Sequence, residues 1–209
     1  MSNRYAQFTE ICYSDKQKYG YESVCRYAKQ AYKNKLNVDL TEFPSFFVYS
    51  KKADLITGCI GFTRGDERNP LLAETYFKFD LLRHVSGGKA SDRKLFGEIG
   101  TRVVSGKEPK LMLFLIAECI IHCCQSDIEY AIFTVPNKMR KLADILNIKP
   151  IEIGKPDLSG KDEKFLNDWK IFLSRNPESF GISIEQAARG SFEIRNNYKN
   201  HGVVVPIKN

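Results

Sequence analysis

Gly97-Glu98-Ile99-Gly100-Thr101-Arg102 lies at the centre of the segments that decide the fold of this chain. It belongs to an apolar stretch, 95–104, whose composition predicts a strand. A long apolar run over 111–125 then predicts a helix, with Pro109 suitably placed near its first turn. The next stretch, 128–135, is almost continuously apolar, as buried strands are. Strand, helix and strand in this order predict a right-handed parallel crossover.

The residues before this unit predict a helix followed by a hairpin. Apolar residues recur at helical spacing over 21–34. Two strands are expected over 45–50 and 55–64, close enough in sequence to pair with each other. Gly58 and Gly61 lie inside the second strand and indicate a bulge or a close backbone approach.

The residues after this unit predict a helix over 137–146, a short strand over 148–153 and a further helix over 162–175. The segment 71–82 is compatible with either helix or strand, and the residues from Ile182 onward show no clear period. An antiparallel hairpin that leads into a parallel crossover predicts a mixed α/β fold, with a mixed central sheet and helices on both faces.

Length and composition are those of one globular domain. The chain has 209 residues, of which 43% are apolar and 27% charged, so we expect a single domain over 1–209, with its core at about 20–190 and a tail at 191–209. The net charge of +7 favours an acidic or phosphorylated partner, such as nucleic acid, a cofactor pyrophosphate, an anionic membrane or an acidic carrier protein.

Two features bear on location and metal binding. The N-terminus shows no signal-peptide pattern, and the apolar run 111–121 is too short to cross a bilayer, so no transmembrane segment and a cytoplasmic location are expected. Cys119-x-x-His122-Cys123-Cys124 has the residue types of a metal site but no second ligand pair. Buried thiols on a helix are therefore favoured, and no metal is expected.

Several short motifs then occur in a fixed order along the chain. They are Gly61-Phe62-Thr63-Arg64, Leu72-Ala73-Glu74-Thr75-Tyr76-Phe77, Gly97-Glu98-Ile99-Gly100-Thr101, Ile132-Phe133-Thr134, Leu146-Asn147-Ile148-Lys149-Pro150, and Trp169 with Asn176-Pro177 and Gly181. In order and spacing they resemble the thermostable hemolysin family. That family is similar to the wider group of acetyltransferase-like (GNAT-like) proteins, which includes autoinducer synthases and N-acyl amino acid synthases.

The chain departs from these patterns at two places. The family's glycine and tyrosines after the tryptophan are missing, because Lys170-Ile171-Phe172-Leu173 follows Trp169 here. Thr101 stands where the autoinducer synthases carry arginine, and Arg102 comes one residue later. The second departure argues against homoserine-lactone synthesis as the particular reaction.

The resemblance implies a GNAT-like fold and an N-acyltransferase of lipid or signal biosynthesis. Such an enzyme moves a fatty acyl group from an acyl carrier protein or an acyl-CoA thioester to the amine of a small amino compound. Glu98 is the first catalytic candidate, because burial in an apolar strand raises the pKa of a carboxyl towards that of a general base. The alternative is a buried structural ion pair between Glu98 and Arg64 or Arg102.

The acceptor side would use the motif around Glu74 and Tyr76. Glu74 could bind the substrate ammonium and Tyr76 could act as a general acid; alternatively both are structural. Arg64 could hold an acceptor carboxylate in a bidentate manner or pair with Glu74 or Glu98. The other substrate-binding candidates are Thr101, Arg102, Phe133 and Thr134, with Thr134 suited to hydrogen-bond the pantetheine arm.

The donor side would use the loop before the long helix. The candidates are Val103, Val104, Ser105, Gly106, Lys107 and Lys110. With one glycine, and a proline that removes a donor, this loop is a poor pyrophosphate cradle. Its lysines, extended by Lys89, Arg93 and Lys94, suit a phosphopantetheine phosphate or an acidic acyl carrier protein; the alternative is a solvated lysine cluster.

Two other functions compete with acyl transfer. A membrane-active hemolysin, as the family name implies, finds little support, because the chain has no transmembrane run and no long amphipathic hairpin. A binding module that keeps the fold without the chemistry is permitted by the charge. The sequence contains no helix-turn-helix, zinc-finger or RNP-like motif, so a nucleic-acid partner is not expected.

Overall fold

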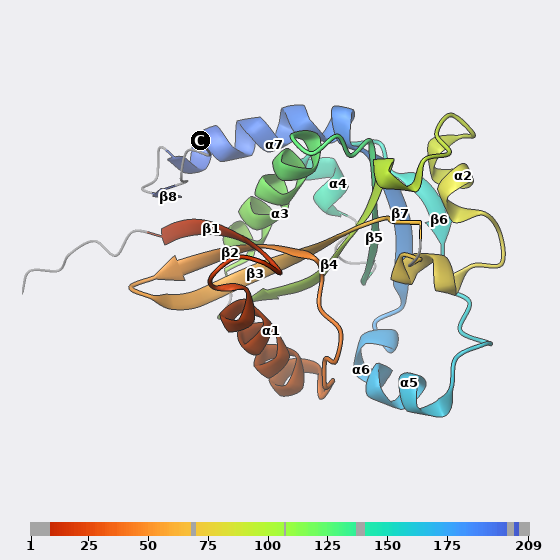
Figure 1. Ribbon diagram of the computed structural model, residues 1–209, viewed down its shortest axis with the longest axis horizontal. Coiled ribbons are helices and arrows are strands. Elements are labelled where there is room, and N and C mark those ends of the chain that lie inside the picture. The colour runs from red at the N-terminus through yellow and green to blue at the C-terminus, as the bar shows by residue number, and fades with distance from the viewer. Residues whose placement is uncertain (1–8, 68–69, 107, 137–140, 200–202, 205–209) are drawn as a thin grey trace, which may run out of the picture.

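The computed structural model describes residues 9–67, 70–106, 108–136, 141–199 and 203–204, and Figure 1 shows their arrangement. The strands are β1 (Thr9–Asp15), β2 (Phe46–Lys52), β3 (Leu55–Arg64), β4 (Phe96–Val104), β5 (Tyr130–Pro136), β6 (Ile151–Gly154), β7 (Pro177–Ser183) and β8 (Val203–Val204). The helices are α1 (Tyr21–Leu36), α2 (Leu81–Ser86), α3 (Pro109–Cys124), α4 (Lys141–Ile145), α5 (Glu163–Asp168), α6 (Lys170–Leu173) and α7 (Ile184–Lys199), with 3-10 turns η1 (Leu72–Tyr76) and η2 (Arg93–Leu95).

The described strands form one mixed sheet in the order β6-β7-β5-β4-β3-β2-β1-β8. β2 and β3 make the expected antiparallel hairpin, and β3 pairs antiparallel with β4. β4 and β5, joined through α3, run parallel. The mixed sheet and the parallel crossover predicted from the sequence are therefore confirmed.

Helices cover both faces of this sheet (Figure 1). On one face α3 is buried almost all round, between the sheet and α7, which explains why its sequence is apolar on every side. The opposite face carries two separate apolar clusters. One joins α1 to β2 and β3, and the other joins η1 and α2 to the first residues of β4 and to β5.

The sheet opens between its two central strands. The parallel pairing of β4 with β5 covers only Phe96–Ile99 and Tyr130–Phe133, although β4 continues to Val104 and β5 to Pro136. At the same point the register with β3 shifts between Cys59 and Gly61, and Thr101 adopts a φ of 44°. This is a β-bulge, which bends β4 away from its neighbour.

The glycines of β3 permit close packing, as their positions in the sequence predicted. A Cβ on Gly58 would lie 2.9 Å from the Val104 side chain, and one on Gly61 would lie 2.2 Å from Pro44. Both distances are shorter than real Cβ contacts allow, so a larger residue at either position would force the neighbouring segment outward.

Five segments differ from the expectations or refine them. Residues 9–15, for which no element was expected, form β1, and the residues from Ile182 onward, which show no clear period, complete β7 and form the long helix α7. The single helix expected over 162–175 is broken into α5 and α6 at Trp169. The ambiguous segment 71–82 forms η1 and the start of α2. Of the helix expected over 137–146, α4 forms the described part, because 137–140 lie outside the described residues.

The cysteines bear on the metal site considered above, and the helix lengths bear on the membrane-active function. Cys119 and Cys123 are buried as free thiols in α3, whereas Cys124 is exposed. In the described part of the chain, no group of three His, Cys, Asp or Glu side chains is placed to hold a metal ion. Among the same residues, no helix is both long enough and apolar enough to cross a membrane.

Candidate active site

The candidate site lies between the two apolar clusters of the α1 face. Glu98 is opposite Thr63 of β3 and Ile132 of β5, and its side chain is on the α1 face of the sheet. Arg102 follows on the same strand beyond the bulge, and Thr134 lies beyond the last residue of β5 that pairs with β4. Polar groups thus collect where the sheet opens.

Glu98 is held by the backbone of η1. The Ala73 N–H donates to Glu98 Oε2 at 3.0 Å. Burial raises the pKa of Glu98 to about 7, although backbone hydrogen bonds from η1 and the positive charge of Arg102 partly oppose the rise. A carboxyl with such a pKa exchanges its proton near neutral pH, as a general base must.

Arg102 bridges the opening between the strands. Its Nη2 donates to the Thr134 carbonyl at 3.0 Å, and its backbone N–H donates to the Tyr32 hydroxyl of α1 at 3.2 Å. The Nη1 atom is buried and has no hydrogen-bond partner among the described residues. A buried guanidinium N–H without a hydrogen-bond partner costs folding free energy. The Nη1 atom is therefore suited to donate a hydrogen bond to a ligand oxygen.

Gly100 forms the floor between Glu98 and Arg102. It pairs with Gly61 and faces the same side of the sheet as Glu98. A Cβ at this position would meet no atom within 4 Å, whereas at Gly97 it would lie 2.1 Å from the Phe62 ring. The space directly above Gly100 is therefore open, beside the carboxylate and the guanidinium.

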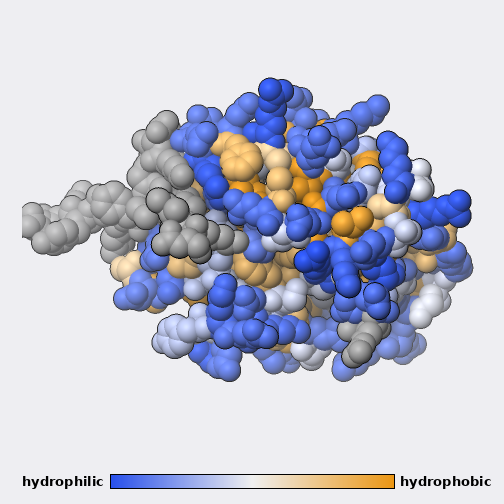
Figure 2. Space-filling model, turned by 45° about the horizontal axis from the view of Figure 1, so that its top comes forward, coloured by the Kyte–Doolittle hydropathy of each residue, from blue (hydrophilic) through white to orange (hydrophobic). Residues whose placement is uncertain are grey.

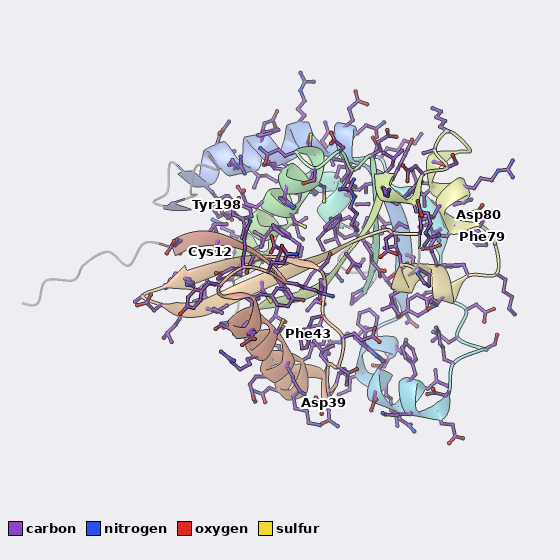
Figure 3. The ribbon with its side chains drawn as sticks, in the orientation of Figure 1. Cys12, Asp39, Phe43, Phe79, Asp80 and Tyr198 are labelled. Atoms are coloured by element: carbon purple, nitrogen blue, oxygen red, sulfur yellow. The ribbon has the colours of Figure 1, made fainter. Side chains whose placement is uncertain are left out.

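An aromatic wall extends from Tyr76, beside Glu98, to Tyr32, whose hydroxyl accepts the Arg102 N–H. Phe165 lies between Tyr76 and Trp169, with ring centroids 6.3 and 6.2 Å away, and Trp169 meets the Tyr32 ring edge-on at 6.1 Å. Phe43, labelled in Figure 3, is in the connection between α1 and β2 on the side towards α6. Of this wall, only Tyr76 was among the site residues predicted from the sequence. The spacing of Phe165 and Trp169, four residues apart, is the signal that indicates the others.

The second acidic candidate, Glu74, has a structural partner that differs from the one expected. It makes a bidentate ion pair with Arg93, at 2.6 and 2.9 Å, and also accepts the Leu71 N–H at 2.7 Å. Arg64 is exposed and donates to the Lys94 carbonyl at 3.0 Å. The partner of Glu74 thus comes from η2, next to the turn that holds Glu98.

Tyr76 lies close enough to Glu98 to feel its charge. Burial and the negative charge of Glu98 both raise the pKa of Tyr76 above its ordinary value, so its hydroxyl stays protonated. Lys161 lies over its ring, with Nζ 5.0 Å from the ring centroid, and donates to the Thr75 hydroxyl at 2.7 Å. These contacts tie the segment before α5 to η1.

The loop after β4 is held by α1. Lys35 Nζ donates to the Val104 carbonyl at 2.6 Å, and the Ser105 hydroxyl meets that of Tyr27 at 2.9 Å. Val103 is buried, and Gly106 adopts a φ of 70°. Lys110 is exposed in the first turn of α3, and the predicted donor residue Lys107 lies outside the described residues.

The structure separates Phe133 from Thr134. Thr134 faces the site and shares a 2.9 Å hydrogen bond with Ser179, whereas Phe133 stacks on Phe180 within the core on the α3 face. An entirely apolar pocket borders Phe133 there; its lining is Ile116, Phe133, Val135, Ala143, Leu146, Ile148, Phe180 and Ile182. Figure 2 turns this side of the molecule towards the viewer.

Comparison with known protein families identifies the chain. The sequence profile of the family described as "Thermostable hemolysin" matches residues 14–188. This chain belongs to the thermostable hemolysin family. The matched range includes Glu98, Arg102 and all the residues of the aromatic wall. No curated protein sequence matches it.

Solved structures show which fold this hemolysin family member has. The acyl-homoserine-lactone synthase LasI is similar with a TM-score of 0.61 and 9% identity, covering 97% of this chain and 100% of LasI. BjaI, a CoA-dependent acyl-homoserine lactone synthase solved with SAM and isopentyl-CoA, has a TM-score of 0.59 and 10% identity, covering 97% and 94%.

FeeM, an N-acyl amino acid synthase from uncultured soil microbes, has a TM-score of 0.59 and 10% identity to this chain, covering 90% of this chain and 98% of FeeM. At such identities the similarity establishes the fold alone. The GNAT-like fold implied by the sequence motifs is confirmed.

Proposed function

We propose that this protein is an N-acyltransferase that moves an acyl group from a thioester to the amine of a small molecule. One observation carries the proposal: Glu98, with a pKa of about 7, borders the open space above Gly100 at the point where β4 and β5 separate. A base, room for a substrate and two strand edges that no longer pair with each other thus occur together.

The chemistry follows from these groups. An ammonium cannot attack a thioester until it loses a proton, and Glu98 is placed to take it, directly or through water. The amine nitrogen then bonds to the carbonyl carbon, the carbon–sulfur bond breaks and the thiolate leaves, while the nitrogen loses its second proton to become an amide. Tyr76, whose hydroxyl stays protonated beside Glu98, is the candidate to donate its proton to the departing sulfur as it takes up the second proton from the nitrogen, and Glu98 releases the first proton to solvent.

The donor would enter through the opening of the sheet. The pairing of β4 and β5 ends at Ile99 and Phe133, so the backbone beyond can hydrogen-bond a pantetheine arm and the thioester oxygen. An acyl chain would lie against the apolar lining of the small pocket beside Phe133, which must widen to admit it. Both acyl-CoA and an acyl carrier protein meet these requirements, and BjaI, solved with isopentyl-CoA, supports a thioester donor on this fold.

The test is release of free thiol. Purified protein is incubated with acyl-CoA of several chain lengths, acyl carrier protein thioesters and a panel of amines. The products are then identified by mass spectrometry. Wild type should release thiol and form an amide with at least one amine, and Glu98→Gln should lose most of this activity. Glu185→Gln, exposed on α7, is the matched control and should retain it. No thiol release by wild type across the panel would overturn the proposal.

A further inference from the structure

The bulge in β4 places a backbone donor beside the opening of the sheet, and a side chain of α1 already binds it. In the bulge one residue of β3, Ile60, is opposite two residues of β4, Thr101 and Arg102. Such an arrangement leaves the extra residue outside the regular pairing of the strands. The backbone N–H of Arg102 donates to the Tyr32 hydroxyl at 3.2 Å. A substrate oxygen that reaches this part of β4 therefore meets the Tyr32 hydroxyl beside the backbone.

The Tyr32 hydroxyl accepts this hydrogen bond and keeps its own proton for another partner. A phenolic hydroxyl can donate and accept at the same time. Within the described part of the chain, its contact with the Arg102 N–H is its one hydrogen bond, and no acceptor takes its proton. Burial raises the pKa of Tyr32, and the positive charge of Arg102 only partly opposes the rise, so the hydroxyl is a neutral donor.

Neighbouring groups fix the position of this hydroxyl. The Tyr32 ring meets the Trp169 ring edge-on at 6.1 Å, and Ala28, one turn earlier on α1, is buried in the cluster that joins α1 to β2 and β3. Beside it, Nη2 of Arg102 binds the Thr134 carbonyl across the opening, and Nη1 is buried without a partner among the described residues. Two unused donors thus occur together, and neither must reorient to meet an oxygen.

We propose that the Tyr32 hydroxyl is a catalytic residue that donates a hydrogen bond to the thioester oxygen. The proposal rests on the acyltransferase function and adds a side-chain donor to those of the strand backbone. As the amine nitrogen bonds to the carbonyl carbon, the π electron pair of the carbonyl moves onto its oxygen, and it returns when the carbon–sulfur bond breaks. A fixed donor therefore stabilises the charged oxygen more than the neutral one. The proton of Tyr32 stays on its hydroxyl throughout.

The competing role for Tyr32 is a cap that only occupies the Arg102 N–H until a substrate arrives. The thioester oxygen would then replace the hydroxyl on this backbone donor. Removal of the hydroxyl would free the donor and leave kcat unchanged or raise it. A catalytic donor predicts the opposite sign, because the transition state loses a hydrogen bond. The two roles are therefore separated by the direction of one kinetic effect.

Tyr32→Phe removes the hydroxyl and keeps the ring that meets Trp169. With the thioester and the amine that wild type uses best, we expect kcat for thiol release to fall about 100-fold, while the KM for the thioester changes less than about threefold. The matched control is Tyr21→Phe, on the same helix, where the lost hydroxyl donates to the Pro44 carbonyl. This control should leave kcat and KM unchanged.

Two further readouts distinguish a donor from a structural residue or a proton carrier. Trp169 is the sole tryptophan of the chain, so its emission reports whether the ring at position 32 keeps its place in Tyr32→Phe. The inflection at about 7 in the pH dependence of kcat/KM, assigned to Glu98, should persist in this variant. Its disappearance would show that Tyr32 acts through Glu98 and would overturn the assignment.

The remaining outcomes are also decisive. If Tyr32→Phe keeps or raises kcat, or changes only the KM, Tyr32 is not the donor and the acyltransferase function stands. If Tyr32→Phe fails to fold, the hydroxyl is structural and the assignment is likewise wrong. If wild type releases thiol with no thioester and amine, the function itself is wrong.

Discussion

Replacing Glu98 by glutamine should stabilise the protein at alkaline pH, because this carboxyl is held where its charge is unfavourable. In the unfolded chain the carboxyl ionises near its ordinary pKa of 4.5, but in the folded chain only near 7. Between these values the folded state binds more protons than the unfolded state, so stability falls as pH rises through this window. Because glutamine does not ionise, the variant does not lose unfolding free energy in this way as pH rises.

The magnitude follows from the two pKa values. Their separation at about 1.4 kcal/mol per pKa unit gives an upper limit of about 3 kcal/mol, reached above pH 7. Urea unfolding of wild type and Glu98→Gln at pH 5 and pH 8 measures it. We expect the variant to gain about 2 kcal/mol relative to wild type between the two pH values, while acyl transfer is lost.

A second buried glutamate is the contrast. Glu118 in α3 is fully buried, accepts Tyr13 Oη–H at 2.5 Å, and forms a bidentate ion pair with Arg195 of α7. Glu118→Gln leaves that guanidinium without its charge partner and should cost about 3–5 kcal/mol at both pH values. If Glu98→Gln destabilises the protein as Glu118→Gln does, or if its effect does not change with pH, the assignment of Glu98 as an acid whose burial outweighs its hydrogen bonds is refuted.

Three further outcomes are expected. Gly100→Val should leave the unfolding free energy almost unchanged but abolish acyl transfer, because its side chain fills the open space of the site; thermal unfolding and thiol release check this. Gly97→Val should instead lower stability by about 1–3 kcal/mol, since its Cβ would overlap the Phe62 ring. Arg93→Ala should lower the unfolding free energy by about 1–3 kcal/mol and lower kcat, because Glu74 loses the ion pair that fixes η1, the turn that donates to Glu98. Urea unfolding measures the first effect and steady-state kinetics the second. An unchanged kcat would contradict this role for the ion pair.

The central crossover was predictable because apolar residues predominate in its segments. Those of 95–104 and 128–135 pack on both faces of the sheet, and α3 lies between the sheet and α7. By contrast, α7 buries Ile184, Ala187, Ala188 and Ser191, which recur at helical spacing. Three of these four are small, so the hydrophobic pattern is too weak to reveal the helix.

The site was predictable only where one residue stands out from its neighbours. Glu98 is an acid in an apolar strand, and the structure shows the desolvation expected there. The ion pair between Glu74 and Arg93 joins residues 19 positions apart in irregular segments, where no periodicity reports contact. The break at Trp169 likewise reflects ring contacts with Tyr32, which lies far away in the sequence.

The pH dependence of kcat/KM for thiol release tests the central claim most directly. If Glu98 is the general base, the rate of wild type should rise with pH to an inflection at about 7, and that inflection should be absent from the residual activity of Glu98→Gln. An inflection at about 7 in both proteins, or an undiminished rate in the variant, would contradict the account.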